Sequence, residues 1–190
     1  FPVRAAGIPV NIKNTNQPED RGTMIVSESA EHCDHIITGI AGKKGMSVIN
    51  IEKDKMNSEI GFGKNVLRAL EKSNVSFEHM PSGVDTMSVV IATEALAGKE
   101  TAIIDEIKSR VHPDQIYIES NLALIAVVGR GMKSARGTAA ILFSALADAR
   151  VNIKMIDQGS SELNIIVGVE EEDFEVAIKA IYKRFIGINQ

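Results

Sequence analysis

MNSEIGFGKNVLRALEKSNVSFEHMPSGVDT, residues 56–86, combines a glycine-containing loop, an amphipathic helix and a strand. Ser58 is a candidate cap for a helix whose first turn contains Gly61 and Gly63. Glycines at a helix start let a ligand approach free main-chain N–H groups, and such a helix end attracts carboxylates. The stretch therefore predicts a small-molecule crevice at the start of the helix.

The helix and the strand follow from the spacing of apolar residues. One buried helix face is predicted from Phe62, Val66, Leu67 and Leu70. Ser73-Asn74 ends this run, and alternation between Val75 and Met80 then predicts a strand. Taken alone, the pattern is one helix-strand unit of an ordinary α+β core.

A repeat distinguishes this chain from an ordinary core. Adding 76 to a residue number carries each element of this unit onto a counterpart in a second unit without a gap. Ile49 corresponds in this way to Ile125, and Gly61 corresponds to Gly137. A strand, a glycine loop, a helix and two further strands recur in the same order, which indicates a duplicated unit.

Each unit then continues into a second amphipathic helix. The predicted buried stripe of this helix is Ile103, Ile104, Ile107 and Val111 in the first unit. In the second unit it is Phe174, Ala177, Ile178, Ile181 and Phe185. With a strand at 116–119, the order becomes β-α-β-β-α-β, the ferredoxin-like arrangement, with an antiparallel sheet covered by two helices. We expect an α+β fold built from two such units.

The second unit lacks a fourth strand, because the chain runs out after Phe185. Ile36–Ala41 is predicted as a strand without a partner, Gly42–Gly45 as a solvated turn, and Met46–Glu52 as the next strand. We infer that Ile36–Ala41 completes the second sheet, so that the first unit is inserted in the second.

Composition limits the class of protein. A content of 44% hydrophobic and 24% charged residues, without a run of about 18 apolar residues, predicts no membrane-spanning helix. The single cysteine, Cys33, excludes an internal disulfide and fits a reducing cytoplasm. A net charge of −4 disfavours a general nucleic-acid binder, which would carry a basic surface. The start without Met suggests a fragment, and no secretory signal is visible.

The cluster His32-Cys33-Asp34-His35 contains possible metal ligands. No second cluster stands elsewhere at ligand spacing, and zinc sites usually draw four ligands from two such pairs. We therefore expect no metal site, and interpret the cluster as a polar entry to a strand.

The paired units with a glycine loop before the first helix resemble tandem ACT domains, the amino-acid-sensing modules of metabolic enzymes. Residues 56–62, MNSEIGF, and 80–85, MPSGVD, look like the regulatory part of an aspartate kinase. Residues 8–15, IPVNIKNT, with Pro18 and Gly22-Thr23, are similar to the junction where that family's kinase domain ends. The likeness covers essentially the whole chain.

The resemblance implies a division of the chain. Residues 1–31 would be the end of a kinase domain and a linker, residues 46–120 one ACT domain, and residues 35–45 plus 121–187 the other. The fragment would have no catalytic residues, no cofactor and no kinase activity. Its parent would transfer the γ-phosphoryl group of ATP to the β-carboxylate of L-aspartate, with ATP and Mg²⁺ in the kinase domain.

In that family a pathway end product, lysine or threonine, binds between ACT units and inhibits the enzyme. The resemblance implies an effector pocket made of Met56, Gly61, Phe62, Gly63, Ser76, Phe77, Glu78, Asp85 and Thr86. Main-chain N–H groups of Phe62 and Gly63 would bind the ligand carboxylate, and strand carbonyls its α-ammonium. The matching positions in the second unit form a possible second site at Met132, Gly137, Ile153 and Gln158.

The carboxylates determine which effector we expect. Glu78 and Asp85 could pair with a second ammonium group, which favours lysine over threonine. The alternative is that both acids are solvated at a strand end. Lys154 stands where Glu78 stands, so like charge disfavours lysine in the second unit. That unit would be structural, an interface, or a site for a neutral amino acid.

Neighbouring ACT units that share a sheet edge would form a homodimer, and effector binding would act on the dimer arrangement. An RNA-binding module of the same topology would need exposed aromatic residues on its central strands. Those positions are aliphatic: Val48, Ile51, Val89 and Val90. We expect no nucleic-acid or membrane partner, while a ligand-free dimerisation module stays an alternative.

Overall fold

The computed structural model describes residues 2–26 and 36–187. The chain divides into two compact units, residues 1–34 and residues 35–190. Within the described ranges, no helix has both the length and the apolar character needed to cross a membrane. The cluster at 32–35, considered above as a metal site, lies outside the described residues.

The small N-terminal unit contains a short helix, α1 (Pro2–Ala5), and an antiparallel pair of strands, β1 (Val10–Ile12) and β2 (Thr23–Ile25). The connection between the strands is held by a hydrogen bond of 2.8 Å from Lys13 Nζ to the Pro18 carbonyl. Gly22 has φ 73°, and a Cβ there would lie 2.5 Å from the Ile12 carbonyl oxygen.

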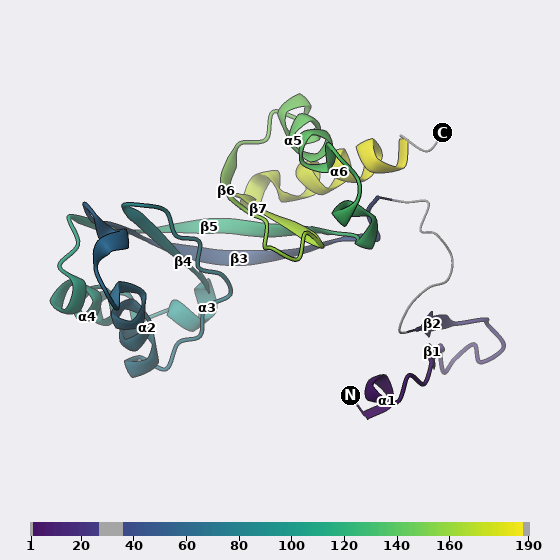
Figure 1. Cartoon of the computed structure of the whole chain (residues 1–190), viewed down its shortest axis with the longest axis horizontal. Helices are drawn as coiled ribbons and strands as arrows, with labels where there is room; N and C mark the ends of the chain where they lie inside the picture. Colours follow the sequence, from purple (N-terminus) through teal and green to yellow (C-terminus); the bar gives the residue numbers. More distant parts are fainter. Residues whose placement is uncertain (1, 27–35, 188–190) are drawn as a thin grey trace. The chain divides into compact units, whose positions relative to one another are not determined.

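In the large unit, five strands form one sheet in the order β4-β3-β5-β7-β6, with antiparallel neighbours throughout (Figure 1). The strands are β3 (Gly39–Glu52), β4 (Thr86–Ala92), β5 (Gln115–Val128), β6 (Ile153–Asp157) and β7 (Asn164–Glu170). The α-helices are α2 (Phe62–Lys72), α3 (Thr93–Leu96), α4 (Glu100–Val111), α5 (Thr138–Asp148) and α6 (Phe174–Gly187). Three 3₁₀ turns are η1 (Met56–Ser58), η2 (Arg130–Lys133) and η3 (Glu171–Asp173).

The helices divide this sheet into two halves. In Figure 1, α2 and α4 lie below one end of the long strands β3 and β5, whereas α5 and α6 lie above the other end. Each helix pair therefore covers its own part of the sheet. The predicted α+β fold of two ferredoxin-like units is confirmed, with both units in a single sheet.

Strands β3 and β5 belong to both halves. Residues 39–43 of β3 pair with residues 124–128 of β5, and residues 48–52 pair with residues 115–119. The predicted turn at Gly42–Gly45 is wrong, because the chain continues there as one strand. The predicted strands at 116–119 and at the start of the second unit likewise merge into β5.

A bulge in each long strand marks the change from one half to the other. The register passes from Lys43↔Leu124 through Met46↔Leu122 to Val48↔Glu119, so β3 and then β5 carries one extra residue. Gly45 has φ 73° and Asn121 has φ 61°, values that these two residue types tolerate best. An extra residue shifts the alternation of side chains. Ile116 and Ile118 of β5 accordingly contact one core, whereas Ile125 and Val127 belong to the other.

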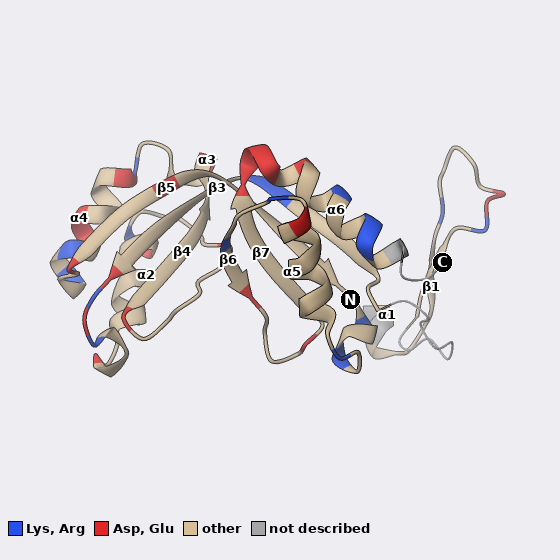
Figure 2. Ribbon diagram, turned by 90° about the horizontal axis from the view of Figure 1, so that it is seen from above, with Lys and Arg blue, Asp and Glu red and all other residues tan. Residues whose placement is uncertain are grey.

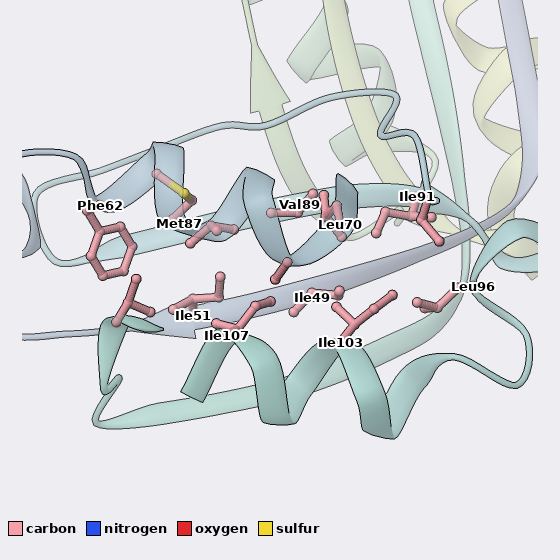
Figure 3. Close-up of a cluster of buried hydrophobic side chains, with 14 of the residues drawn as sticks. Ile49, Ile51, Phe62, Leu70, Met87, Val89, Ile91, Leu96, Ile103 and Ile107 are labelled. Carbon is pink, nitrogen blue, oxygen red and sulfur yellow. The ribbon is translucent and has the colours of Figure 1, made fainter. Parts of the chain in front are cut away.

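Each half has its own buried core. Core 1 lies between the sheet and helices α2 and α4 (Figure 3). Its labelled members are Ile49, Ile51, Phe62, Leu70, Met87, Val89, Ile91, Leu96, Ile103 and Ile107. Core 2 lies under α5 and α6 and includes Ile125, Val127, Leu142, Leu146, Val167, Ala177 and Ile181. The helix faces predicted from apolar spacing are confirmed in both halves, except that Ile104 is only half-buried and does not belong to core 1.

A third cluster, the seam, connects the halves. It consists of Met46, Val48, Val90 and Leu122, with Ala92, Leu124 and Met155 packed against it. These residues come from β3, β4, β5 and β6, so the seam joins strands of both halves. Beside it, the Ser47 hydroxyl is buried and bonds to Thr93 Oγ1 at 2.9 Å and to Ser120 Oγ at 3.0 Å.

Two local predictions in the first half are wrong. Ser58 does not cap α2: it ends η1, its hydroxyl donates to the Lys55 carbonyl at 2.8 Å, and the cap residue is Gly61. Residues 75–80 do not form a regular strand. They contact β4 through an isolated bridge between His79 and Val90. Pro81 has no N–H to continue this ladder, whereas the equivalent segment of the second half forms β6.

Charges at the last helix follow its dipole. Acidic residues gather in η3 before α6, and basic residues follow toward its end (Figure 2). This order places negative charge near the N-terminus of the helix and positive charge near its C-terminus, which stabilises the helix.

Gly42 tests the contact between β3 and α6. A Cβ at Gly42 would lie 2.4 Å from Cζ of Phe174, whereas a Cβ at Gly39 in the same strand would meet no described residue within 4 Å. We expect Gly42→Ala to lower the free energy of unfolding by about 1–3 kcal/mol, because Phe174 must move. Gly39→Ala should change it by less than about 0.5 kcal/mol. Urea unfolding measures the free energy of unfolding of both variants. Equal losses in Gly42→Ala and Gly39→Ala would contradict the close approach of Phe174 to Gly42.

Candidate functional site

The loop before α2 presents the start of that helix. Gly61 is the N-cap residue with φ 85°, a conformation that glycine adopts without strain. Gly137 precedes α5 with the same φ of 85°. Met56 and Met132, at the start of the two loops, are both buried. The two halves therefore repeat the same helix entry, as the sequence repeat predicts.

Free N–H groups lie at the start of α2. The first bond of the helix runs from Asn65 N–H to the Gly61 carbonyl at 3.0 Å. Phe62 N–H donates to the Glu59 carbonyl at 3.2 Å, so it is already engaged. Gly63 and Lys64 N–H have no hydrogen-bond partner within residues 2–26 and 36–187. A carboxylate at this helix end could accept from these two groups.

The two acids proposed to bind an ammonium group already have partners. Glu78 Oε1 pairs with Lys43 Nζ at 2.5 Å, and both side chains are about half exposed. Asp85 Oδ1 accepts from Lys55 N–H at 2.8 Å, and the Asp85 carbonyl accepts from Lys53 N–H at 2.9 Å. Asp85 therefore holds the loop before η1, where Lys55 has φ 57°.

Two open grooves contain part of the predicted sites. Groove 1, of about 550 Å³, lies between α2 and the segment after it. Its lining is Lys64, Leu67, Arg68, Leu70, Glu71, Val75, Ser76 and Phe77. Of the nine predicted effector residues, only Ser76 and Phe77 line it. Buried Met56 and Phe62 belong to core 1, and exposed Thr86 begins β4.

Groove 2, of about 360 Å³, lies at the start of α5. It is lined by residues 132–139 together with Gln158 and Glu162. Three of the four predicted second-site residues, Met132, Gly137 and Gln158, therefore meet in one groove. Ile153 is absent from its lining.

Lys53 is a residue that the sequence reasoning missed. Its Nζ bonds to Glu59 Oε2 and to the Val111 carbonyl, the latter at 2.5 Å, and lies 5.8 Å from the centre of the Phe62 ring. It thereby joins the loop before α2 to the C-terminal end of α4, where a cation is favoured. No sequence motif marks this role, because the partners are 6 and 58 positions away.

Lys154 does not face groove 2. Its Nζ bonds to Glu119 and, at 3.2 Å, to Glu170. Hydrogen bonds to Glu119 and then to Glu170 raise the pKa of Lys154 above its ordinary value. Its charge is therefore balanced within the sheet. The expected repulsion of a cationic ligand by Lys154 loses its structural basis.

Glu106 on α4 forms another charged cluster. Hydrogen bonds from Lys72 and then from Arg110 lower the pKa of Glu106 below its ordinary value. Lys72 is on α2, so the cluster joins the two helices of the first half. For metals, no group of three or more candidate ligands occurs within the described ranges.

Known proteins match the chain over most of its length. A family model described as ACT domain matches residues 125–185. Aspartokinase 3 of Bacillus subtilis is 42% identical over 186 residues, which is 97% of this chain and 41% of that protein. The chain therefore spans about two fifths of this relative.

Solved structures match as well. Clostridium acetobutylicum aspartate kinase has 55% sequence identity and a TM-score of 0.93, covering 98% of this chain and 43% of that one. E. coli aspartokinase III, in complex with lysine and aspartate, has a TM-score of 0.78 at 20% identity, covering 97% of this chain and 40% of that one. The latter likeness bears on the fold alone.

The Lys154 cluster supports a prediction about stability and pH. We expect Lys154→Met to lower the midpoint of urea unfolding, because Glu119 and Glu170 would lose their shared cation. The raised pKa means that this stabilisation is complete below pH 10.5 and is lost as the pH rises through the higher folded-state value. Urea unfolding of the wild-type chain and of Lys154→Met at pH 8 and at pH 11 measures this effect. The difference between their two midpoints should be smaller at pH 11.

Lys179→Met serves as the matched control for this variant. Lys179 is exposed on α6 and has no charged partner in the described part of the chain. A midpoint for Lys154→Met equal to that of Lys179→Met at pH 8 would contradict the role given to the cluster.

Proposed function

Because this chain corresponds to the C-terminal regulatory region of aspartate kinases, we propose that it binds a free amino acid and thereby inhibits the kinase to which it belongs. The reaction of the whole protein would be phosphorylation of L-aspartate by ATP, with Mg²⁺, in a catalytic part beyond this chain. We assign the protein to the cytoplasm, for which the single cysteine is the support.

The duplicated helix entry is the observation that carries this proposal. Gly61 and Gly137 have the same φ of 85°, and each precedes a helix of eleven residues. At the first entry, Gly63 and Lys64 N–H have no partner among the described residues and could bind the carboxylate that every amino acid carries. Groove 2 adds Met132, Gly137 and Gln158 at the second entry. A carboxylate site that occurs twice suits a sensor of amino acids.

We propose a division of the chain that follows the two halves. Residues 46–120 form one ACT domain around core 1, and residues 35–45 with 121–187 form the other around core 2. Pairing of residues 39–43 with residues 124–128 supports this division. Residues 1–31 would be the end of the kinase domain and a linker.

We propose lysine as the effector, with threonine as the alternative. Glu78 is accessible, and its present partner is the ammonium group of Lys43, which the ε-ammonium of a lysine ligand could replace. The bound lysine named for E. coli aspartokinase III also supports this choice. Asp85 is an anchor of the loop in this proposal, because it already accepts two main-chain N–H groups with its side chain and carbonyl.

Calorimetry with L-lysine and with L-threonine tests the sensor function. We expect saturable binding of L-lysine and no binding of D-lysine. Glu78→Gln should weaken L-lysine about tenfold, since a charge-assisted hydrogen bond is lost, and should leave L-threonine unchanged. Glu94→Gln, at an exposed residue of α3, is the control. If neither amino acid binds, the chain is a dimerisation module rather than a sensor.

A homodimer through the ACT domains forms part of the proposal. The segment after α2 lies at the outer side of β4, and Phe77 in it is 43% exposed. We expect Phe77→Asp to raise the dissociation constant of the dimer at least tenfold, because a charge would replace an aromatic side chain at the proposed interface. Val176→Asp, at an exposed position of α6, is the control. Sedimentation equilibrium measures the dissociation constants of both variants. Equal constants for Phe77→Asp and Val176→Asp would contradict an interface at Phe77.

A further inference from the structure

The segment Ser76–His79 contacts the second half of the sheet through one ion pair and one close approach of polar side chains. Glu78 pairs with Lys43, which lies in the part of β3 that pairs with Leu124. His79 Nε2 lies 3.5 Å from Asp157 Oδ2, at the end of β6. Main-chain bonds fix the same segment to β4, since Glu78 N–H donates to the Val90 carbonyl and Val90 N–H donates to the His79 carbonyl, both at 2.8 Å.

The His79 side chain is unusual among these contacts. Its Nε2 atom is buried and has no hydrogen-bond partner within the described residues. A buried polar atom without a partner is costly, and Asp157 is just beyond hydrogen-bonding distance. A small movement of the segment toward β6 would close this gap. We call the observed arrangement open, and the hydrogen-bonded arrangement that such a movement would produce closed.

This contact joins two residues that are close in sequence to the linings of the two grooves. Ser76 and Phe77 line groove 1, three and two positions before His79. Gln158 lines groove 2 and directly follows Asp157. We expect a ligand that shifts Ser76–Phe77 to move His79 as well, and a ligand that shifts Gln158 to move Asp157.

We propose that the His79–Asp157 contact couples the two grooves, so that occupation of one changes the affinity of the other. The inference rests on the proposed amino-acid sites and names His79 and Asp157 as positioning residues. A ligand of either groove that favours the closed contact prepares the other groove for binding, which is coupling by a shared two-state element. The reciprocal effect must be equal in size.

In the part of the chain that the structure describes, the charged groups near His79 come from β6 and from its own segment. Asp157 faces it from β6, and Glu78 precedes it in its own segment but is neutralised by Lys43 from β3. On β4, its neighbour is the apolar Val90. The closed contact with Asp157 is a charge-assisted bond only when the imidazole is protonated, so we expect lower pH to favour it.

Nuclear magnetic resonance of the full 190-residue chain tests the coupling, with L-lysine and L-threonine as probes. We expect the amino acid that shifts the Ser76–Glu78 amide signals to shift the Gln158 and Gly159 signals at the same ligand concentration. In His79→Gln and in Asp157→Asn, the Gln158 shift should fall at least twofold while the Ser76–Glu78 shifts remain. Asp105→Asn, at an exposed position of α4, should retain both.

The outcomes separate the coupling from the sensor function. Gln158 shifts that persist in both variants would overturn the coupling while the sensor function stands. If neither amino acid shifts Ser76–Glu78, the sensor proposal fails, and a pH titration without ligand decides the coupling. The Gln158 amide should then follow the titration of the His79 ring protons in the wild-type chain and lose this dependence in Asp157→Asn. If the His79 ring protons titrate in the wild-type chain while the Gln158 amide signal does not change, the proposed coupling is refuted.

Discussion

The pairing of β3 with β5 is the interaction on which the rest of the large unit depends. These two strands of fourteen residues each run through both halves, and every other strand of the sheet is attached to one of them directly or through β7. Helices α2 and α4 cover one end, and α5 and α6 cover the other. The two ferredoxin-like units therefore share backbone hydrogen bonds as well as side-chain contacts.

The two bulges make this sharing possible. A strand with strict alternation would present the same set of side chains to one face along its whole length. The extra residues near Gly45 and Asn121 shift the alternation, so that β5 contributes Ile116 and Ile118 to core 1 and Ile125 and Val127 to core 2. The seam of Met46, Val48, Val90 and Leu122 lies where the alternation changes. The junction between the units is thus formed by two strand bulges and a separate apolar cluster.

The charged side chains are organised around the same junction. Lys43 with Glu78, His79 with Asp157 and Lys154 with Glu119 all connect residues far apart in the chain. Each pair joins the first half of the sheet to the second. In the proposed sensor, these pairs are the physical links between an amino acid bound in one groove and the rest of the regulatory region.

Apolar periodicity and glycine positions alone predicted the duplicated fold, the helix faces and the two equivalent helix entries, because these depend on residues near each other in the chain. The same information was wrong at Gly42–Gly45, since a glycine with positive φ occurs both in turns and in strand bulges, and only pairing with β5 distinguishes them. It also treated Glu78, Asp85 and Lys154 as ligand-facing charges. Tertiary structure gave each a partner at least 16 positions away, which no local pattern encodes.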